Sequence, residues 1–194
     1  MVTMTHRMLL AFAFAGILSA SAPAATTTWA IDPAHSSVNF EVVHLGVSHV
    51  HGSLVGVNGT LTYDDNDVSK SSVNATIDTK TVSTGVERRD SDLKSPNYFN
   101  IEKYPQISFK STAVTKVAGK LQLVGELTLN GVTKTVTMDL DGPVPPQVYQ
   151  GKTISAFSAT GTIKRTDFNF APKTPSAVVG DDVKFTIDVE IDKK

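Results

Sequence analysis

Large apolar and polar residues alternate along most of the chain after residue 30. Between Val183 and Ile191 (VKFTIDVEI), every odd position is apolar and every even position is polar. A period of two predicts a β-strand with one buried face and one face in water. The same pattern predicts eight strands, at residues 38–44, 55–63, 73–79, 107–113, 121–129, 132–140, 157–163 and 183–191.

These strands predict an all-β fold with one continuous apolar face. Asn130-Gly131 lies between two of them and favours a hairpin with a type I′ turn, so the sheet is expected to be antiparallel. Closing eight strands into an up-and-down barrel buries the apolar face without leaving edges, and a two-sheet sandwich is the alternative. A short helix is expected from Glu87 to Lys94, between the third and fourth strands, and it ends before Pro96.

The first residues are typical of an export signal. Arg7 precedes the apolar run from Met8 to Leu18, and Ala22 and Ala24 provide a small-residue cleavage site. We therefore expect a signal peptide at residues 1–24 and a single barrel domain at residues 25–194. No later apolar stretch approaches the roughly 20 residues of a spanning helix, so a soluble periplasmic protein without a transmembrane segment is expected.

Composition narrows the range of functions. The chain has 18 Lys+Arg against 19 Asp+Glu, and its basic residues are scattered, so nucleic acid is not expected as a partner. The sequence contains no Cys, which excludes disulfides, thiol catalysis and cysteine-ligated metals. Any metal site would need His and carboxylate ligands.

The interior of the predicted barrel is either hollow or packed. Eight strands enclose a space that side chains just fill or that holds one small ligand. Small residues at mid-strand would leave a hollow if they align, or else they mark bends in the strands. They are Gly59, Ala75, Gly125, Ala159 and Gly161.

Several side chains are candidates for contact with an internal ligand. Seven lie on the apolar phase of their strands: Phe40, Val42, Leu61, Phe109, Leu127, Phe157 and Ile187. His44 points inward by the same alternation, where it meets a polar head group or bonds a backbone carbonyl. Phe99, with Tyr98 and Tyr104, lies beside the helix and either lines a tunnel entrance or covers one barrel end.

The remaining histidines offer other chemistry. His49 and His51 are two residues apart on one strand face and could supply imidazoles to zinc or copper, with His44 on the same hairpin. The local stretch offers no obvious acidic third ligand, so no metal site is expected and a solvated or hydrogen-bonded pair is favoured. His35 beside Ser36 suggests a hydrolase, but no nucleophile elbow is present and a turn-capping role is favoured.

Two arginines are alternative head-group ligands. Arg89 belongs to a mixed charge run that is typical of a solvated helix face. Arg89 or Arg165 could instead bind a diphosphate or another polar head at the barrel mouth, because a planar guanidinium suits such groups.

Motifs along the whole chain resemble the YceI-like family. They comprise Trp29 to Gly52 with its Asp-x-x-His-Ser strand, Arg89-Asp90 with Leu93, Tyr98-Phe99, Tyr104-Pro105-x-Ile107-x-Phe109, Gly125 to Lys134, and Arg165-x-Asp167-Phe168. Leu54 and Asn169 depart from the family pattern, at positions where an aromatic residue and Gly are more usual. The resemblance implies a lipocalin-like eight-stranded barrel in the periplasm that holds a long isoprenoid, such as a polyprenyl chain or a quinone tail.

Three functions are compared on this basis. The favoured one is a carrier of an isoprenoid or related lipid, with no further cofactor, which contacts membranes or membrane enzymes transiently as a monomer or a homodimer. A packed barrel that acts in stress or interaction without a ligand is the alternative. An enzyme is disfavoured because no nucleophile–base pair or acid–base dyad can be assembled from the motifs.

Overall fold

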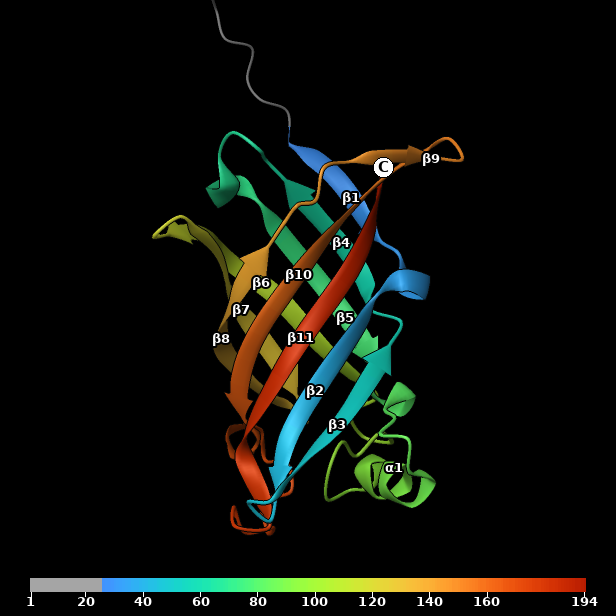
Figure 1. Ribbon diagram of the computed structural model, residues 1–194, viewed down its shortest axis with the longest axis vertical. Helices are drawn as coiled ribbons and strands as arrows, with labels where there is room; N and C mark the ends of the chain where they lie inside the picture. The colour runs from blue at the N-terminus through green and yellow to red at the C-terminus, as the bar shows by residue number, and fades with distance from the viewer. Residues whose placement is uncertain (1–25) are drawn as a thin grey trace, which may run out of the picture.

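The computed structural model describes residues 26–194, so the predicted signal peptide at residues 1–24 lies outside the described part. The described chain is mostly β-strand with one α-helix (Figure 1). The strands are β1 (Thr27–Ile31), β2 (Ser37–His44), β3 (Ser48–Val55), β4 (Asn58–Tyr63), β5 (Ser72–Asp78), β6 (Gln106–Val117), β7 (Lys120–Leu129), β8 (Val132–Asp141), β9 (Gln147–Tyr149), β10 (Lys152–Lys164) and β11 (Val179–Lys193). The helix is α1 (Glu87–Lys94), and the 3-10 helices are η1 (Pro33–His35), η2 (Val68–Lys70), η3 (Thr79–Thr81) and η4 (Arg165–Phe168). None of the helices within residues 26–194 has the length and apolar character needed to cross a membrane.

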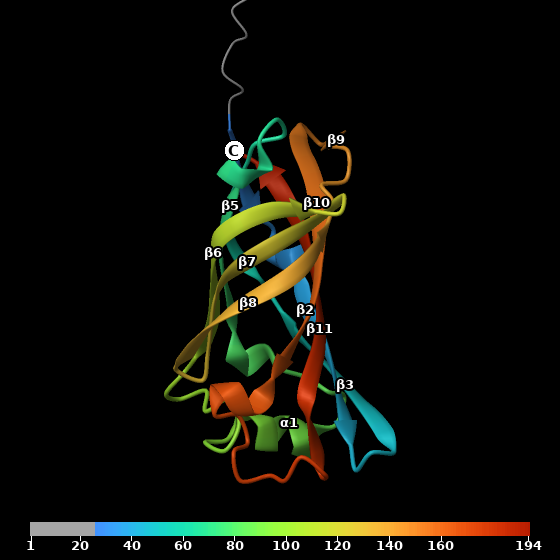
Figure 2. The same cartoon turned by 90° about the vertical axis from the view of Figure 1, so that its left-hand side faces the viewer.

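The sheet closes on itself as an eight-stranded antiparallel barrel. The ring runs β11-β1-β4-β5-β6-β7-β8-β10, and β10 pairs with β11 to close it. The closing pair is long, because residues 154–164 of β10 face residues 182–192 of β11. Figure 2 shows the strands tilted around the barrel axis. The closed ring confirms the predicted barrel.

A second hairpin extends this ring toward α1. β1 pairs with the last residues of β11 and β2 pairs with residues 179–188, so β1 and β2 share one edge of β11. β3 pairs with β2 as β4 pairs with β1. The far edge of β3 meets the chain before α1 at one bridge, Ser53 with Ser83, and its residues nearer the hairpin tip have no ladder partner on that edge within residues 26–194.

The predicted helix and the predicted hairpin are confirmed. α1 spans the expected residues Glu87–Lys94. Asn130 and Gly131 connect β7 and β8 with φ of 52° and 75°, the positive values that a type I′ turn requires.

Two of the predicted strand faces are wrong. Residues 55–63 do not form one strand, because the chain breaks at Gly56, where φ is +81°. Val55 is therefore exposed and Leu54 is buried. In β6 a bulge between Ser111 and Ala113 shifts the register by one residue, so Val114 rather than Ala113 points inward.

The predicted set of strands also differs in extent. β1, β3 and β9 are not among the eight predicted strands, although the histidine pair His49 and His51 was placed on a strand. β9 lies within the Pro-rich segment that was expected to be a loop. The last strand begins at Val179, four residues before the start of the apolar alternation at Val183.

Aromatic rings close the barrel end beside α1. The ring of Phe99 lies edge-on against that of Phe170, with centroids 4.7 Å apart, and Tyr98 packs on the same Phe170 ring. The amide of Ala171 donates to the carbonyl of Asn97 at 2.9 Å and joins the two loops that carry these rings. Phe99 and Tyr98 therefore both cover the barrel end and line the space behind it. Tyr104 instead packs against the turn at Gly131.

Candidate ligand-binding site

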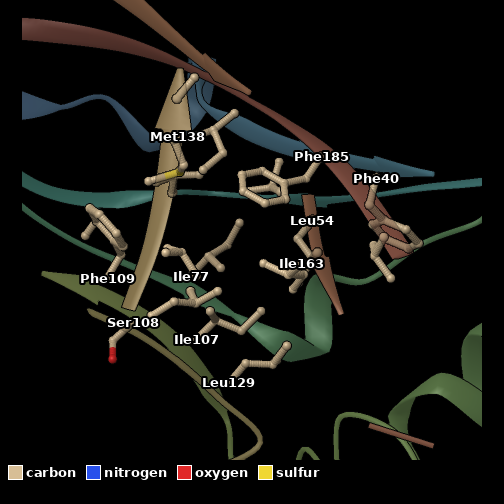
Figure 3. Close-up of a pocket in the computed structure, with 18 of the residues that line it drawn as sticks. Phe40, Leu54, Ile77, Ile107, Ser108, Phe109, Leu129, Met138, Ile163 and Phe185 are labelled. Atoms are coloured by element: carbon tan, nitrogen blue, oxygen red, sulfur yellow. The ribbon is translucent and has the colours of Figure 1, made fainter. Parts of the chain in front are cut away.

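A cavity of about 390 Å³ occupies the barrel interior. This volume is within the range of about 300–1,000 Å³ that is usual for small-molecule pockets. Its wall is almost wholly apolar and comes from strands all around the ring, as Figure 3 shows for part of it. The apolar wall includes Val73, Ile77, Ile107, Val114, Leu121, Leu123, Leu129, Val136, Met138, Leu140, Ile163, Val183, Phe185 and Val189.

All nine predicted ligand-contact residues lie on this wall. They are Phe40, Val42, His44, Leu61, Phe99, Phe109, Leu127, Phe157 and Ile187. The alternation that selected all of them except Phe99 also applies to Val136, Met138 and Phe185, which were not selected although they carry the same signal. The structure places the nine predicted residues on the cavity wall, and the contact of these residues with a lipid is a proposal.

The inward side chains are unusually accessible for a protein interior. Phe109, Leu127 and Ile187 point into the barrel but are only partly buried, whereas Phe168 and Ile191 are fully buried where elements pack together. A side chain in a packed core contacts neighbours on all sides. These residues lack neighbours on one side because the centre of the barrel is open, so the alternative of a packed barrel is wrong.

One interpretation of the sequence was that small residues at mid-strand leave the hollow. Gly125 and Gly161 do not do so. A Cβ placed on Gly161 would lie 2.6 Å from the ring of its cross-strand partner Phe185. A Cβ on Gly125 would be just as close to the ring of Phe109 and would lie 2.5 Å from the carbonyl oxygen of Lys110. Each glycine is thus covered by an aromatic ring from a neighbouring strand, and the ring occupies the space that the missing side chain leaves.

Ala75 and Ala159, the two alanines of the same set, line the cavity itself. Ala159 is buried in a small cluster with Val114, Leu123 and Met138. Ala75, by contrast, is only partly buried.

Polar groups gather at the end of the cavity between β3 and α1. His44 and Val50 from the β2–β3 hairpin and Arg89 and Asp92 from α1 line this end, together with Thr84. Within the described residues, the edge of β3 that faces α1 has no ladder partner here, and we identify this end as the cavity mouth.

A small hydrogen-bond network fixes the position of Arg89 at the mouth. Its Nε donates to Thr84 Oγ1 at 2.7 Å and its Nη2 to the Thr84 carbonyl at 3.0 Å, while Nη1 makes no hydrogen bond within residues 26–194. Asp90 accepts from the Thr84 amide and hydroxyl, and these bonds, the hydroxyl first, hold the pKa of Asp90 below its usual value. Among the described residues, the network thus leaves Nη1 of Arg89 without a partner at the mouth.

The His44 ring lies on the cavity wall without a protein partner in the described chain. Its imidazole makes no hydrogen bond to any of residues 26–194, so the interpretation that it bonds a backbone carbonyl is wrong. Tyr63 also lines the cavity, and burial raises the pKa of its phenol above its usual value.

Arg165 is part of the scaffold rather than the mouth. Its side chain is 2% exposed and its guanidinium donates to the carbonyls of Phe170, Ala171, Thr174, Val179 and Gly180. Its Nη2 also lies 3.1 Å from a carboxylate oxygen of Asp181. With its donors engaged in this way, Arg165 is not available for a head group, and that interpretation of it is wrong.

Asp32, His35 and Ser36 form a capped turn. Asp32 accepts from the Ala34 amide at 2.8 Å and contacts the His35 ring at 2.9 Å, and this bond raises the pKa of His35. The Ser36 hydroxyl accepts from the Glu190 amide at 3.1 Å. Ser36 thus joins the turn to β11. A hydrolase pair would instead require a hydrogen bond between the Ser36 hydroxyl and the His35 ring.

His49 and His51 lie on the outer face of the hairpin. They are exposed to solvent, as the favoured interpretation of the sequence predicted. The expectation that no acidic group accompanies them is wrong, because Glu41 lies across the ladder on β2. His49 Nδ1 contacts a Glu41 carboxylate oxygen at 2.8 Å.

A closed eight-stranded antiparallel barrel around an apolar cavity defines the class of protein as a small, lipocalin-like barrel. The model of the family described as the YceI-like domain matches residues 29–191. "Protein YceI" of Salmonella agona (strain SL483) is 38% identical over 184 residues, which cover 94% of this chain and 95% of the relative. The chain belongs to the YceI-like family.

Solved structures share the fold. The YCEI protein of Campylobacter jejuni is 30% identical and superposes with a TM-score of 0.69 over 78% of this chain and 90% of that protein. BcnA of Burkholderia cenocepacia superposes with a TM-score of 0.71 at 22% identity, over 82% of this chain and 98% of its own. A polyisoprenoid binding domain from Saccharophagus degradans reaches a TM-score of 0.65 at 14% identity, over 87% of this chain and 99% of that domain.

Proposed function

We propose that this protein is a periplasmic carrier that holds a long-chain isoprenoid, polyprenyl or quinone-like, or a related lipid inside its barrel. The observation that carries the proposal is the cavity of about 390 Å³ with an almost wholly apolar wall. Such a wall offers hydrocarbon contact and few hydrogen bonds, so it suits a chain rather than a sugar or nucleotide. The polyisoprenoid binding domain with the same fold supports this choice of ligand class.

The energetics of burial suit a long chain. Each methylene removed from water contributes about 0.8 kcal/mol, so one five-carbon unit contributes about 4 kcal/mol before ordering costs are subtracted. A few buried units are sufficient for tight binding. Because the wall is uniform in chemistry, neighbouring chain lengths should bind with similar affinity.

The mouth gives the ligand an orientation. We place the tail among the aliphatic residues and Phe rings and the polar head between His44 and Arg89. There the His44 ring and Nη1 of Arg89 make no hydrogen bond to any of residues 26–194. The β2–β3 hairpin tip beside this mouth exposes Leu45 and Val47, and Val47 is 83% exposed. Apolar residues at a turn tip suit brief contact with a bilayer from which a lipid is taken.

Extraction of the purified protein tests the proposal. We expect organic extracts of the protein, purified from the periplasm without detergent, to contain an isoprenoid or acyl lipid close to one per chain by mass spectrometry. The same extract from protein unfolded and refolded in lipid-free buffer is the control. Lipid-free protein that also fails to take up polyprenols or quinones from vesicles would contradict the carrier function.

The charge at the mouth should affect head-group preference. Replacing Arg89 by Gln should weaken binding of a polyprenyl diphosphate about tenfold, because hydrogen bonds to a charged group are worth about 1.5–3 kcal/mol. Binding of the matching polyprenol should change little. Competition against a fluorescent polyene measures both affinities, and Arg88→Gln on the same helix, outside the cavity wall, is the matched control. An equal loss for alcohol and diphosphate would show that Arg89 acts on the fold of the mouth and not on the head group.

A further inference from the structure

The outer face of the β2–β3 hairpin carries a cluster of two imidazoles and one carboxylate. Glu41 pairs with His51 across the β2–β3 ladder, and His49 lies diagonally from it on β3. His49 Nδ1 is 2.8 Å from one oxygen of Glu41, and His51 Nδ1 is 3.9 Å from the other. One carboxylate thus lies within reach of both rings, on the side of the hairpin away from the cavity.

These residue types in this arrangement match the ligands of borderline transition metals. Imidazole suits Zn²⁺, Cu²⁺ and Ni²⁺, and a carboxylate commonly completes such sites. Side chains two apart on a strand project from the same face, and the residue directly across the ladder projects beside them. The hydrogen-bonded ladder therefore holds the three Cβ atoms in fixed positions.

The side chains themselves are free to adjust. His49 is 53% exposed and His51 is 70% exposed, so both rings can rotate about their side-chain bonds without displacing core residues. Glu41 is 28% exposed. A glutamate carboxylate is ionised at neutral pH, as a metal ligand must be.

We propose that His49, His51 and Glu41 form a binding site for a divalent transition-metal ion such as Zn²⁺ on the outer face of the hairpin. Three protein ligands leave at least one coordination position for water. The Lys184 ammonium, 3.4 Å from Glu41, competes with the ion for the carboxylate and limits the affinity. The site is separate from the lipid cavity and does not depend on its ligand.

An ion at this position would stiffen the cavity mouth. Ligands from β2 and β3 would join the two strands at a place where, within residues 26–194, β3 has no ladder partner on its other edge. Val42, His44 and Val50 on the inner face of the same hairpin line the mouth. We therefore expect Zn²⁺ to slow amide hydrogen exchange in the β3 residues 48–52.

A second cluster provides the competing location. Asp32, His35 and Glu190 bring two carboxylates and one imidazole together, with candidate ligand atoms within 4.8 Å of one another. The hairpin site has two imidazoles, which favour Zn²⁺, Cu²⁺ or Ni²⁺ over the hard cations that carboxylates prefer. Variants at each cluster distinguish the two locations.

Titration of the tag-free protein with ZnCl₂ in a calorimeter tests the site. We expect one ion per chain with a dissociation constant on the order of micromolar. His49→Ala and His51→Ala should each weaken binding about tenfold or more, and Glu41→Gln should weaken it several-fold. Lys184→Gln should strengthen binding. His44→Ala is the matched control, because that ring lies on the cavity side of the same hairpin.

Two results would overturn the proposal. The first is a wild-type dissociation constant of about millimolar or weaker, which a lone surface imidazole would explain. The second is loss of binding in His35→Ala with no change in His49→Ala and His51→Ala, which would assign the ion to the Asp32 cluster. We expect every variant to fold, since the substituted hairpin side chains are on the surface or beside open space. Circular dichroism of each variant checks this.

Discussion

Ala75→Phe is expected to reduce lipid binding about a hundredfold while the barrel still folds. Ala75 lines the cavity and is only partly buried, so a larger side chain there extends into open space. Phe109, its partner across the β5–β6 ladder, provides an aromatic neighbour for the new ring. Displacing part of one five-carbon unit costs about 2–3 kcal/mol of binding free energy, which corresponds to about a hundredfold in affinity.

The measurement pairs retained lipid per chain with the thermal midpoint. Ala75→Val is a graded control that fills less space and should reduce binding less. Gly125→Ala is the control for overpacking, because its new Cβ would meet the Lys110 carbonyl, which cannot move without the backbone. It should lower stability by about 1–3 kcal/mol. If Ala75→Phe lowers the midpoint as Gly125→Ala does and leaves bound lipid unchanged, the chain does not occupy this part of the cavity.

Much of the barrel wall could be predicted because alternation depends only on the strand itself. Each strand places every second side chain on one face, so Phe40, Leu127 and Ile187 were assigned to the interior without knowledge of their neighbours. The assignment of inward-facing residues failed where a bulge adds one residue to a strand and where the chain breaks a predicted strand in two. The bulge before Ala113 and the positive φ at Gly56 each change which residues face inward.

The filling of the barrel could not be predicted because it depends on pairing between strands. From the sequence alone, Gly161 on an inward face suggests unfilled volume. Only the pairing of Gly161 with Phe185 shows that an aromatic ring covers this position. The same limit applies to the hairpin, where Glu41 is eight residues from His49 in sequence and becomes its neighbour only when β2 and β3 pair. Register decides both the shape of the cavity and the chemistry on its outer wall.

Arg165→Met is expected to destabilise the protein by about 3–5 kcal/mol, the range measured when one partner of a buried charged group is removed. The guanidinium holds the loop between η4 and β11 through carbonyls from Phe170 to Gly180. Met fills a similar volume but donates no hydrogen bond, so those carbonyls and the Asp181 carboxylate would lose their shared donor. Arg165→Lys should recover only part of the loss, because one ammonium cannot reach all of these acceptors.

Urea unfolding followed by circular dichroism measures this effect, with Lys164→Met as the matched control. Lys164 precedes Arg165 and forms an exposed ion pair with Asp182 at 2.9 Å, which is worth about 0–1 kcal/mol. A structural role for Arg165 further predicts that folded Arg165→Met protein, held well below its midpoint, binds polyprenol and polyprenyl diphosphate in the same ratio as the parent protein. A selective loss of the diphosphate with unchanged stability would instead place the guanidinium at the head group, against its burial among backbone carbonyls.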